Sequence, residues 1–231
     1  MKRAIMVAIS VILALCLCAP IAVAQSTNSA DKLTTGELGA EWWQWVLSKP
    51  TKVNPMNGNY TGGAQCSGEA VKGVWFLAGS FSNIAQGGQA VERTCTAPAG
   101  TSIFFPVINV ECSVVEGDGT NEAELRACAT GIMDDVDANT GSITAAVDGN
   151  DVLADHSSRA DTPLFTWVIP RDNVFNSLLG RNLPPGPSDS VADGRWVELP
   201  PLSKGEHDIE FGGSFYEGDL IQENTYHLTV K

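Results

Sequence analysis

Apolar residues recur at helical spacing near the start of the chain. Within Thr35–Leu47 they fall at positions i, i+4, i+7 and i+8, which share one face of a helix: Leu38, Trp42, Trp45 and Val46. Pro50 marks the end of this pattern. We therefore predict one short helix that packs its apolar face on the core. Trp43 projects away from that face, which makes it a candidate for stacking on a ligand.

A second apolar stripe follows farther along the chain. Asn121 and Glu124 have the spacing of a capping box, which predicts that a helix begins there and runs to about Val136. The inward positions of this helix share the same spacing rule: Leu125, Cys128, Ile132 and Val136. Cys128 is then directed toward the core, where it can pair with a cysteine on a neighbouring strand.

Short runs of aromatic and β-branched residues, bounded by glycine and proline, predict strands along the rest of the chain. These runs are Gly73–Gly79, Ser102–Val110, Pro163–Pro170, His207–Phe211 and Thr225–Val230. Pro106 in the second run indicates an edge strand or a bulge. Asp148 and Gly149 separate two further short runs and predict a hairpin with a type I′ turn. The predicted fold is mainly β, an antiparallel, jelly-roll-like β-sandwich with two short packed helices and two disulfides.

The amino-terminal residues have the layout of a secretory signal. Lys2 and Arg3 precede an apolar run that ends at Ala22-Val23-Ala24, a small-x-small cleavage site. We therefore expect residues 1–24 to be a signal peptide, removed on export to a secreted or periplasmic location. The competing interpretation is a membrane anchor, which is weaker because Pro20 interrupts the run.

Removal of that segment leaves about 207 of the 231 residues, a length that one all-β domain commonly has. Residues 25–34 are small and polar and predict a flexible leader, and residues 35–231 predict a single β-sandwich domain. The formal net charge is -13 at pH 7 before the basic signal residues are removed. Because no cluster of lysine and arginine remains to neutralise phosphates, the sequence argues against nucleic acid and against insertion in a membrane after export.

Four cysteines remain after the signal, which itself contains Cys16 and Cys18: Cys66, Cys95, Cys112 and Cys128. An even number in an oxidising compartment predicts disulfides, and four cysteines allow three connectivities. We favour sequential pairing, Cys66 with Cys95 and Cys112 with Cys128, because it closes short loops. Each such bridge contributes about 3 kcal/mol by restricting the unfolded chain. Zinc ligation is disfavoured, since the chain has no C-x-x-C or H-x-x-x-H spacing.

Gly180–Gly194 is rich in proline, glycine and aspartate and predicts a long loop. Long loops in compact domains are often functional, and prolines reduce the entropy lost on binding. The candidate ligand-binding residues combine aromatic groups with acids from this loop: Trp43, Tyr60, Asp189, Asp193 and Trp196. Tyr60 also belongs to Asn59-Tyr60-Thr61, an acceptor sequence for N-glycosylation in a host that carries out this modification.

Calcium is the one metal for which the sequence offers a candidate site. Asp135, Asp137 and Asn139 alternate as the first ligands of an EF-hand loop do. The match ends there, because Thr140 stands where the loop needs glycine and Ala146 where it needs a bidentate glutamate. The remaining alternatives are a calcium loop of another type and an acidic helix end without metal. No other cofactor is predicted, since no phosphate-binding glycine motif is present.

Catalytic chemistry has a weak signal in this sequence. Glu41 and Glu111 lie in apolar contexts where burial would raise a carboxyl pKa. A glycosidase needs two such carboxyl groups about 5–10 Å apart across a cleft. No G-x-S-x-G sequence is present to provide a serine nucleophile. These observations leave a secreted hydrolase that acts on glycans with paired carboxylates as the alternative function.

Several sequence blocks, taken in order, carry a resemblance to a family. They are "EWWQWVLSKP", "GVWFLAGSF", "SIFFPVINVEC", "GEHDIEFGG" and "TYHLTV". Together they resemble an uncharacterised group of exported, mostly bacterial proteins, and the resemblance spans nearly the whole mature chain. It implies export and a single compact domain, and it brings no reaction, ligand or catalytic residue with it.

The sequence as a whole favours a binding domain over an enzyme. We predict an exported, non-catalytic domain that recognises a glycan, another cell-envelope component or another exported protein. A shallow aromatic surface is expected for such a binding domain, whereas a deep cleft with two facing carboxylates would indicate the hydrolase.

Overall fold

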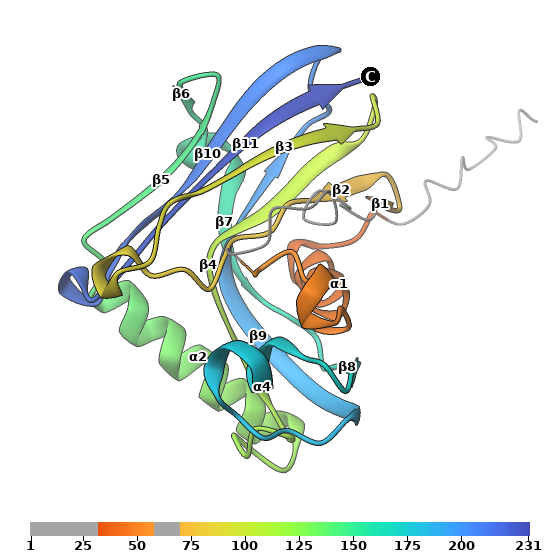
Figure 1. The fold of residues 1–231 in the computed structure, drawn as a ribbon, viewed down its shortest axis with the longest axis vertical. Coiled ribbons are helices and arrows are strands. Elements are labelled where there is room, and N and C mark those ends of the chain that lie inside the picture. The colour runs from red at the N-terminus through yellow and green to blue at the C-terminus, as the bar shows by residue number, and fades with distance from the viewer. Residues whose placement is uncertain (1–31, 58–69) are drawn as a thin grey trace, which may run out of the picture. The chain divides into compact units, whose positions relative to one another are not determined.

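The computed structural model describes residues 32–57 and 70–231, which are drawn in colour in Figure 1. The predicted signal peptide, residues 25–31 of the predicted leader, Asn59, Tyr60 and Cys66 lie outside these ranges. Lys32–Lys231 forms one compact unit. Lys32 pairs with Glu198 at 2.7 Å, and Thr34 caps the first helix, so the last residues of the predicted leader contact the domain.

Two β-sheets make up most of the described structure. The first has six strands in the order β1-β2-β4-β9-β7, with β8 also paired to β9: β1 (Ala70–Val71), β2 (Val74–Phe76), β4 (Ser102–Ser113), β9 (Gly186–Leu199), β7 (Ser157–Asp161) and β8 (Phe165–Ile169). The second has five strands in the following order: β3 (Val91–Ala97), β11 (Leu220–Val230), β10 (Gly205–Phe215), β5 (Ser142–Val147) and β6 (Asn150–Asp151). The prediction of a mainly β fold is confirmed.

The sheets are mixed, which corrects the expectation of wholly antiparallel pairing. β2 runs parallel to β4, and β3 runs parallel to β11, while the other pairs are antiparallel. The chain passes from β2 in the first sheet to β3 in the second and then back to β4. Neighbours that are not consecutive in the chain are not joined by a hairpin, so their relative direction is free to be parallel.

Helices accompany the sheets: α1 (Thr35–Leu47), α2 (Glu122–Ala138), α3 (Leu153–His156) and α4 (Val174–Leu179). The bounds of α1 agree with the sequence prediction. Its start is fixed by a capping box in which the Thr34 side chain and the Glu37 side chain each bond the other residue's backbone N–H. None of the helices in the described ranges is long and apolar enough to cross a membrane.

The first sheet is covered on both faces. One face of β9 and β4 packs on α1 through a cluster that contains Trp42, Phe104 and Trp196. The opposite face packs on the second sheet along one half of the strands, where Phe105 meets Phe211 with ring centroids 4.5 Å apart. Along the other half, the same face packs on α2. Figure 1 shows α1 and α2 on opposite sides of β9.

A β-bulge in β4 changes which residues face each layer. Pro106 pairs with Trp196 and Ile108 with Arg195, so Val107 is an extra residue opposite an uninterrupted β9. The position of Pro106 predicts either an edge strand or a bulge. Because β4 lies between β2 and β9 inside the sheet, the bulge is the correct alternative. After the bulge, even-numbered residues such as Cys112 face α2, whereas odd-numbered residues face the α1 side.

The disulfide predicted between Cys112 and Cys128 is present and joins β4 to α2, with the Cα atoms 6.2 Å apart. The other predicted pair contains Cys66, outside the described residues, so that pairing stays a prediction. α2 buries Leu125 and Val136 as expected, but Met133 takes the place of Ile132, which is 41% exposed.

The hairpin prediction is confirmed by positive φ at both central residues, 51° at Asp148 and 77° at Gly149. The loop predicted from Gly180 to Gly194 is wrong beyond residue 185, because β9 begins at Gly186. Ser188 and Ser190 occupy inward positions of this strand, where an apolar residue is usual. The Ser190 hydroxyl accepts a hydrogen bond from Trp167 Nε1 at 2.7 Å, which removes the cost of burying it.

Candidate functional site

The three tryptophans of α1 are all buried, which corrects the prediction for Trp43. Trp42 is 0% exposed, Trp43 5% and Trp45 6%. Trp43 lies off the apolar stripe of the helix, but residues near Met56 and Ser80 cover that side. Trp43 is therefore not available for stacking on a ligand at the surface, and its contacts lie in the interior.

A pocket of about 150 Å³ lies between α1, β4 and the start of β11. We call it the indole pocket, and its walls include Trp42, Trp43, Met56, Ser80, Phe81 and Asn109. None of the described residues that line it is charged. The pocket is thus a small, uncharged space with aromatic and amide walls.

The β4 bulge supplies one of these walls. Asn109 follows the extra residue and therefore faces α1 rather than α2. It pairs with Gly194 of β9, and a Cβ at that glycine would come within 2.6 Å of the Asn109 Cβ. Glycine at position 194 is required for this close approach. The bulge and Gly194 together place the Asn109 carboxamide against the tryptophan helix.

Three polar atoms on residues lining the indole pocket are buried and have no hydrogen-bond partner in the described structure: Trp43 Nε1, Ser80 Oγ and Asn109 Nδ2. A buried polar atom without a partner costs about 1–3 kcal/mol. By contrast, the indole of Trp42 donates to the Leu77 carbonyl at 2.8 Å. Unsatisfied groups that gather at one pocket are typical of a site that completes its hydrogen bonds with a ligand.

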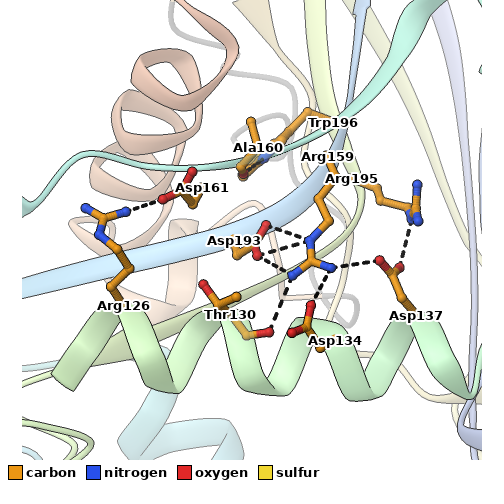
Figure 2. A network of polar contacts seen from close by, with 10 residues as sticks. All are labelled: Arg126, Thr130, Asp134, Asp137, Arg159, Ala160, Asp161, Asp193, Arg195 and Trp196. Carbon is orange, nitrogen blue, oxygen red and sulfur yellow. Dashed lines mark hydrogen bonds and ion pairs between the residues drawn. The ribbon is translucent and has the colours of Figure 1, made fainter. Parts of the chain in front are cut away.

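The predicted acidic residues lie in a different place, an ion-pair network between α2 and the first sheet (Figure 2). Arg159 of β7 donates to Asp193 through Nε and Nη2, the latter at 2.6 Å, and pairs with Asp137 at 3.0 Å. Its Nη1 also lies 2.7 Å from a carboxylate oxygen of Asp134. Arg195 Nε donates to the other oxygen of Asp137 at 2.9 Å. The bonds to Asp193 are the main reason that the pKa of Arg159 is raised.

This network uses two of the predicted site acids. Asp193 is 3% exposed and is satisfied by Arg159, so it does not offer a free carboxylate to a ligand. Asp137 accepts from two guanidinium groups, which already neutralise its charge. The network attaches α2 to β7 and β9, and its role in the described structure is structural.

The predicted calcium ligands do not form a cage. Asp135 and Asp137 both lie within α2, where residues two positions apart point to different sides of the helix. Asn139 caps the helix, and its Nδ2 donates to the Asp135 carboxylate at 3.0 Å. A helix continues where the sequence pattern required a loop, so the alternating spacing does not bring these oxygens together.

Two further residues that were predicted to bind a ligand, Asp189 and Trp196, lie in β9. Trp196 is 0% exposed and stacks on Phe104 with ring centroids 5.3 Å apart, so it cannot stack on a surface ligand. Asp189 is exposed and accepts a hydrogen bond from the Thr166 hydroxyl at 2.6 Å. Tyr60 lies outside the described residues. The surface predicted from the aromatic residues is therefore not assembled by the residues that the structure describes.

Among the described residues, one group of three His, Cys, Asp or Glu side chains has its potential metal-ligand atoms within 4.8 Å of one another. It consists of Cys112, Asp118 and Cys128. The two sulfurs are joined in the disulfide, so they are not thiolates that could bind a metal. The Asp118 carboxylate instead accepts from the Ser113 backbone N–H at 3.0 Å.

A pair of carboxyl groups lies at the end of β4. Burial raises the pKa of Glu111 well above its usual value of 4.5, and the adjacent Glu116 carboxylate raises it further. Burial also raises the pKa of Glu116, while a hydrogen bond with Glu111 and the charge of Arg181 oppose that change. Each group affects the pKa of the other through a hydrogen bond, a closer arrangement than the two sides of a glycosidase cleft.

No protein-family model, curated protein or solved structure matches this chain. The resemblance to exported, mostly bacterial proteins therefore stays a prediction. No sequence motif predicts the indole pocket, because the unpartnered polar atoms belong to residues 43, 80 and 109, which are far apart in the chain.

Replacing Arg159 by methionine tests the structural role of the network. The change leaves the buried Asp193 carboxylate unpaired, and we expect it to lower the free energy of unfolding by about 3 kcal/mol. The matched control is Arg126→Met, because Arg126 pairs with Glu122 and Asp161, whose side chains are 50% and 53% exposed. That loss should be about 1 kcal/mol or less. Equal losses in urea unfolding would contradict the assignment.

Glu111→Gln tests the raised pKa of Glu111. A carboxyl whose pKa is raised in the folded state stabilises the fold below its unfolded pKa, and this contribution is lost as the pH rises through the folded value. The wild-type protein should therefore lose stability relative to the variant as the pH rises above 4.5. Urea unfolding of both proteins over a series of pH values measures this difference. A difference that does not change with pH would show that Glu111 titrates normally.

Proposed function

We propose that this protein is an exported, non-catalytic binding domain, with its two sheets arranged as a jelly-roll-like sandwich, and that the indole pocket is its ligand site. The observation that carries the proposal is that three residues lining one pocket each have a buried polar atom without a hydrogen-bond partner in the described structure: Trp43 Nε1, Ser80 Oγ and Asn109 Nδ2. A ligand that forms hydrogen bonds with these atoms offsets the desolvation penalty of burying them.

The chemistry of the pocket restricts the ligand class. Trp43 Nε1 and Asn109 Nδ2 are hydrogen-bond donors, and the Ser80 hydroxyl can donate or accept. The ligand must therefore carry acceptor oxygens. It is neutral, because no charged residue is among those described as lining the pocket. A cavity of about 150 Å³ holds one six-membered ring. A single sugar residue of a neutral cell-envelope glycan has these properties.

Entry of the ligand requires a side chain to move. The three polar atoms are covered in the structure as it stands, so an oxygen reaches them only when a neighbouring group shifts. Met56 lines the pocket and is 6% exposed. Its unbranched, flexible side chain can change rotamer at small cost, which makes it the adaptable wall of the pocket.

Binding is supported over hydrolysis by the position of the acids. Glu111 and Glu116 are in contact with each other and are not among the residues that line the indole pocket. Secretion or a periplasmic location is supported by the Cys112–Cys128 disulfide, since disulfides persist in oxidising compartments.

Trp43→Phe and Trp45→Phe form a matched pair of variants for this site. Both indoles lie in α1, both are buried, and both have an unpartnered Nε1, but only Trp43 lines the indole pocket. In calorimetric titration with a panel of neutral cell-envelope saccharides, Trp43→Phe should weaken binding about tenfold because one hydrogen bond is lost. Trp45→Phe should bind like the wild type.

Two results would overturn the proposal. Equal affinities of the two tryptophan variants would show that the pocket is not the site. A wild-type protein that binds no neutral saccharide at millimolar concentration would show that the ligand class is wrong. Circular dichroism of each variant establishes that the fold is retained.

Ser80→Ala should have opposite effects on stability and on binding. Removing a buried hydroxyl without a partner should raise the free energy of unfolding by about 1 kcal/mol, because its desolvation cost disappears. The same change should weaken saccharide binding. A loss of stability in thermal unfolding would show that this hydroxyl already has a partner in solution and is not held for a ligand.

A further inference from the structure

A second hollow lies next to the indole pocket. Its volume is about 620 Å³, and the described residues that line it are 81–83 and 86–90, together with Asn57 and Leu178. We call it the amide hollow, because four carboxamide side chains are among its walls: Asn57, Asn83, Gln86 and Gln89. As in the indole pocket, none of the described residues that line it is charged.

The two hollows share a continuous wall. Met56 and Ser80 line the indole pocket, whereas the nearby Asn57 and Ser82 line the amide hollow. Phe81 lines both. The Phe81 backbone N–H donates to the Met56 carbonyl at 3.0 Å, which fixes the two segments side by side. Phe81 therefore borders both hollows, and an aromatic ring is a side chain on which a sugar can stack.

The carboxamides differ in what they already bind. Asn83 is used by the fold: its Nδ2 donates to the Asp219 carbonyl at 2.9 Å, and its Oδ1 accepts from the backbone of Ile221 at 3.0 Å. The side chains of Gln86 and Gln89 are exposed and make no hydrogen bond within the described structure. Each offers a donor and an acceptor in one plane, which matches the hydroxyl groups of a neutral sugar.

The loop that carries Gln86 and Gln89 is held in one shape. The Ser82 hydroxyl donates to the Gln89 carbonyl at 2.7 Å and accepts from the Gln89 N–H at 2.9 Å. Gly88 donates to the Asn83 carbonyl at 2.8 Å, and a Cβ at Gly88 would lie 2.7 Å from that oxygen. A loop that is already ordered loses little entropy on binding, which favours a ligand site over a flexible surface.

We propose that the ligand is a linear, neutral oligosaccharide, with its terminal ring in the indole pocket and the following rings over Phe81 and in the amide hollow. This inference rests on the proposed function, and it deepens it from one sugar ring to a chain of at least two. The volume of the amide hollow, about four times that of the indole pocket, accommodates the additional rings.

The test is a chain-length series of the neutral saccharide that the mature protein binds best, from monosaccharide to tetrasaccharide, measured by calorimetry. For the wild type, affinity should rise about tenfold from the monosaccharide to the trisaccharide, as added hydrogen bonds form. In a Gln86→Met/Gln89→Met variant, which changes only exposed side chains, this gain should disappear while monosaccharide affinity is retained. Trp43→Phe should weaken the binding of every length by a similar factor.

The outcomes separate the two proposals. If wild-type affinity is independent of chain length while Trp43→Phe still weakens binding, the extended site is wrong and the proposed function stands. If the glutamine variant keeps the length dependence, the amide hollow is not where the chain binds. If no neutral saccharide of any length binds, both proposals fail. Binding of charged saccharides alone would also overturn both, because the described walls carry no opposite charge.

Discussion

The extra residue in β4 is the constraint on which the layered arrangement depends. A strand has a period of two, so inserting Val107 opposite an uninterrupted β9 exchanges the faces of every later residue. Cys112 is thereby directed to α2, where Cys128 completes a disulfide, and Asn109 is directed to α1. Without the bulge, the cysteine would face the tryptophan cluster and the carboxamide would face α2. One local irregularity therefore determines both the covalent link and the wall of the proposed site.

The tryptophan helix serves stability and the proposed binding with different side chains. Trp42 is fully buried, donates to the Leu77 carbonyl and packs against Trp196 with ring centroids 5.9 Å apart. Its burial contributes several kcal/mol to folding at about 25 cal/mol per Å² of apolar area. Trp43, the next residue, is also buried, but its indole N–H has no hydrogen-bond partner in the described structure. The helix thus contains one indole N–H with a hydrogen-bond partner, in Trp42, and one without, in Trp43. Such a combination is expected where a binding function reduces stability.

The acids that the sequence analysis singled out in α2 and β9 are engaged by other side chains in the described structure. The clustered aspartates at the end of α2 look like a cation site in the sequence, yet Arg159 and Arg195 come from strands distant in the chain to neutralise them. A buried carboxylate such as Asp193 persists only because that partner is present. At the end of β4, burial instead raises the pKa values of Glu111 and Glu116, which affect each other through a hydrogen bond.

Local chemistry in the sequence determined several elements by itself. The bounds of α1 follow from the spacing of its apolar residues and the Thr34 cap, and the Asp148–Gly149 turn follows from a backbone conformation that few residues adopt. The pairing of Cys112 with Cys128 was predictable because the strand and the helix that carry them are close in the chain. In each case the interacting residues are near neighbours, so the pattern is visible without knowledge of the fold.

Only the tertiary structure decided the rest. β9 was missed because it buries Ser188, Ser190 and Asp193. These polar side chains are tolerated there because a backbone N–H, an indole and a guanidinium group from other parts of the chain donate hydrogen bonds to them. The parallel strand pairs arise because the chain alternates between sheets. The indole pocket unites a helix, a loop and a bulged strand whose side chains share no spacing in the sequence. Satisfaction of a buried polar group is a property of its surroundings, so the groups left unsatisfied, and the site they mark, become visible only when those surroundings are assembled.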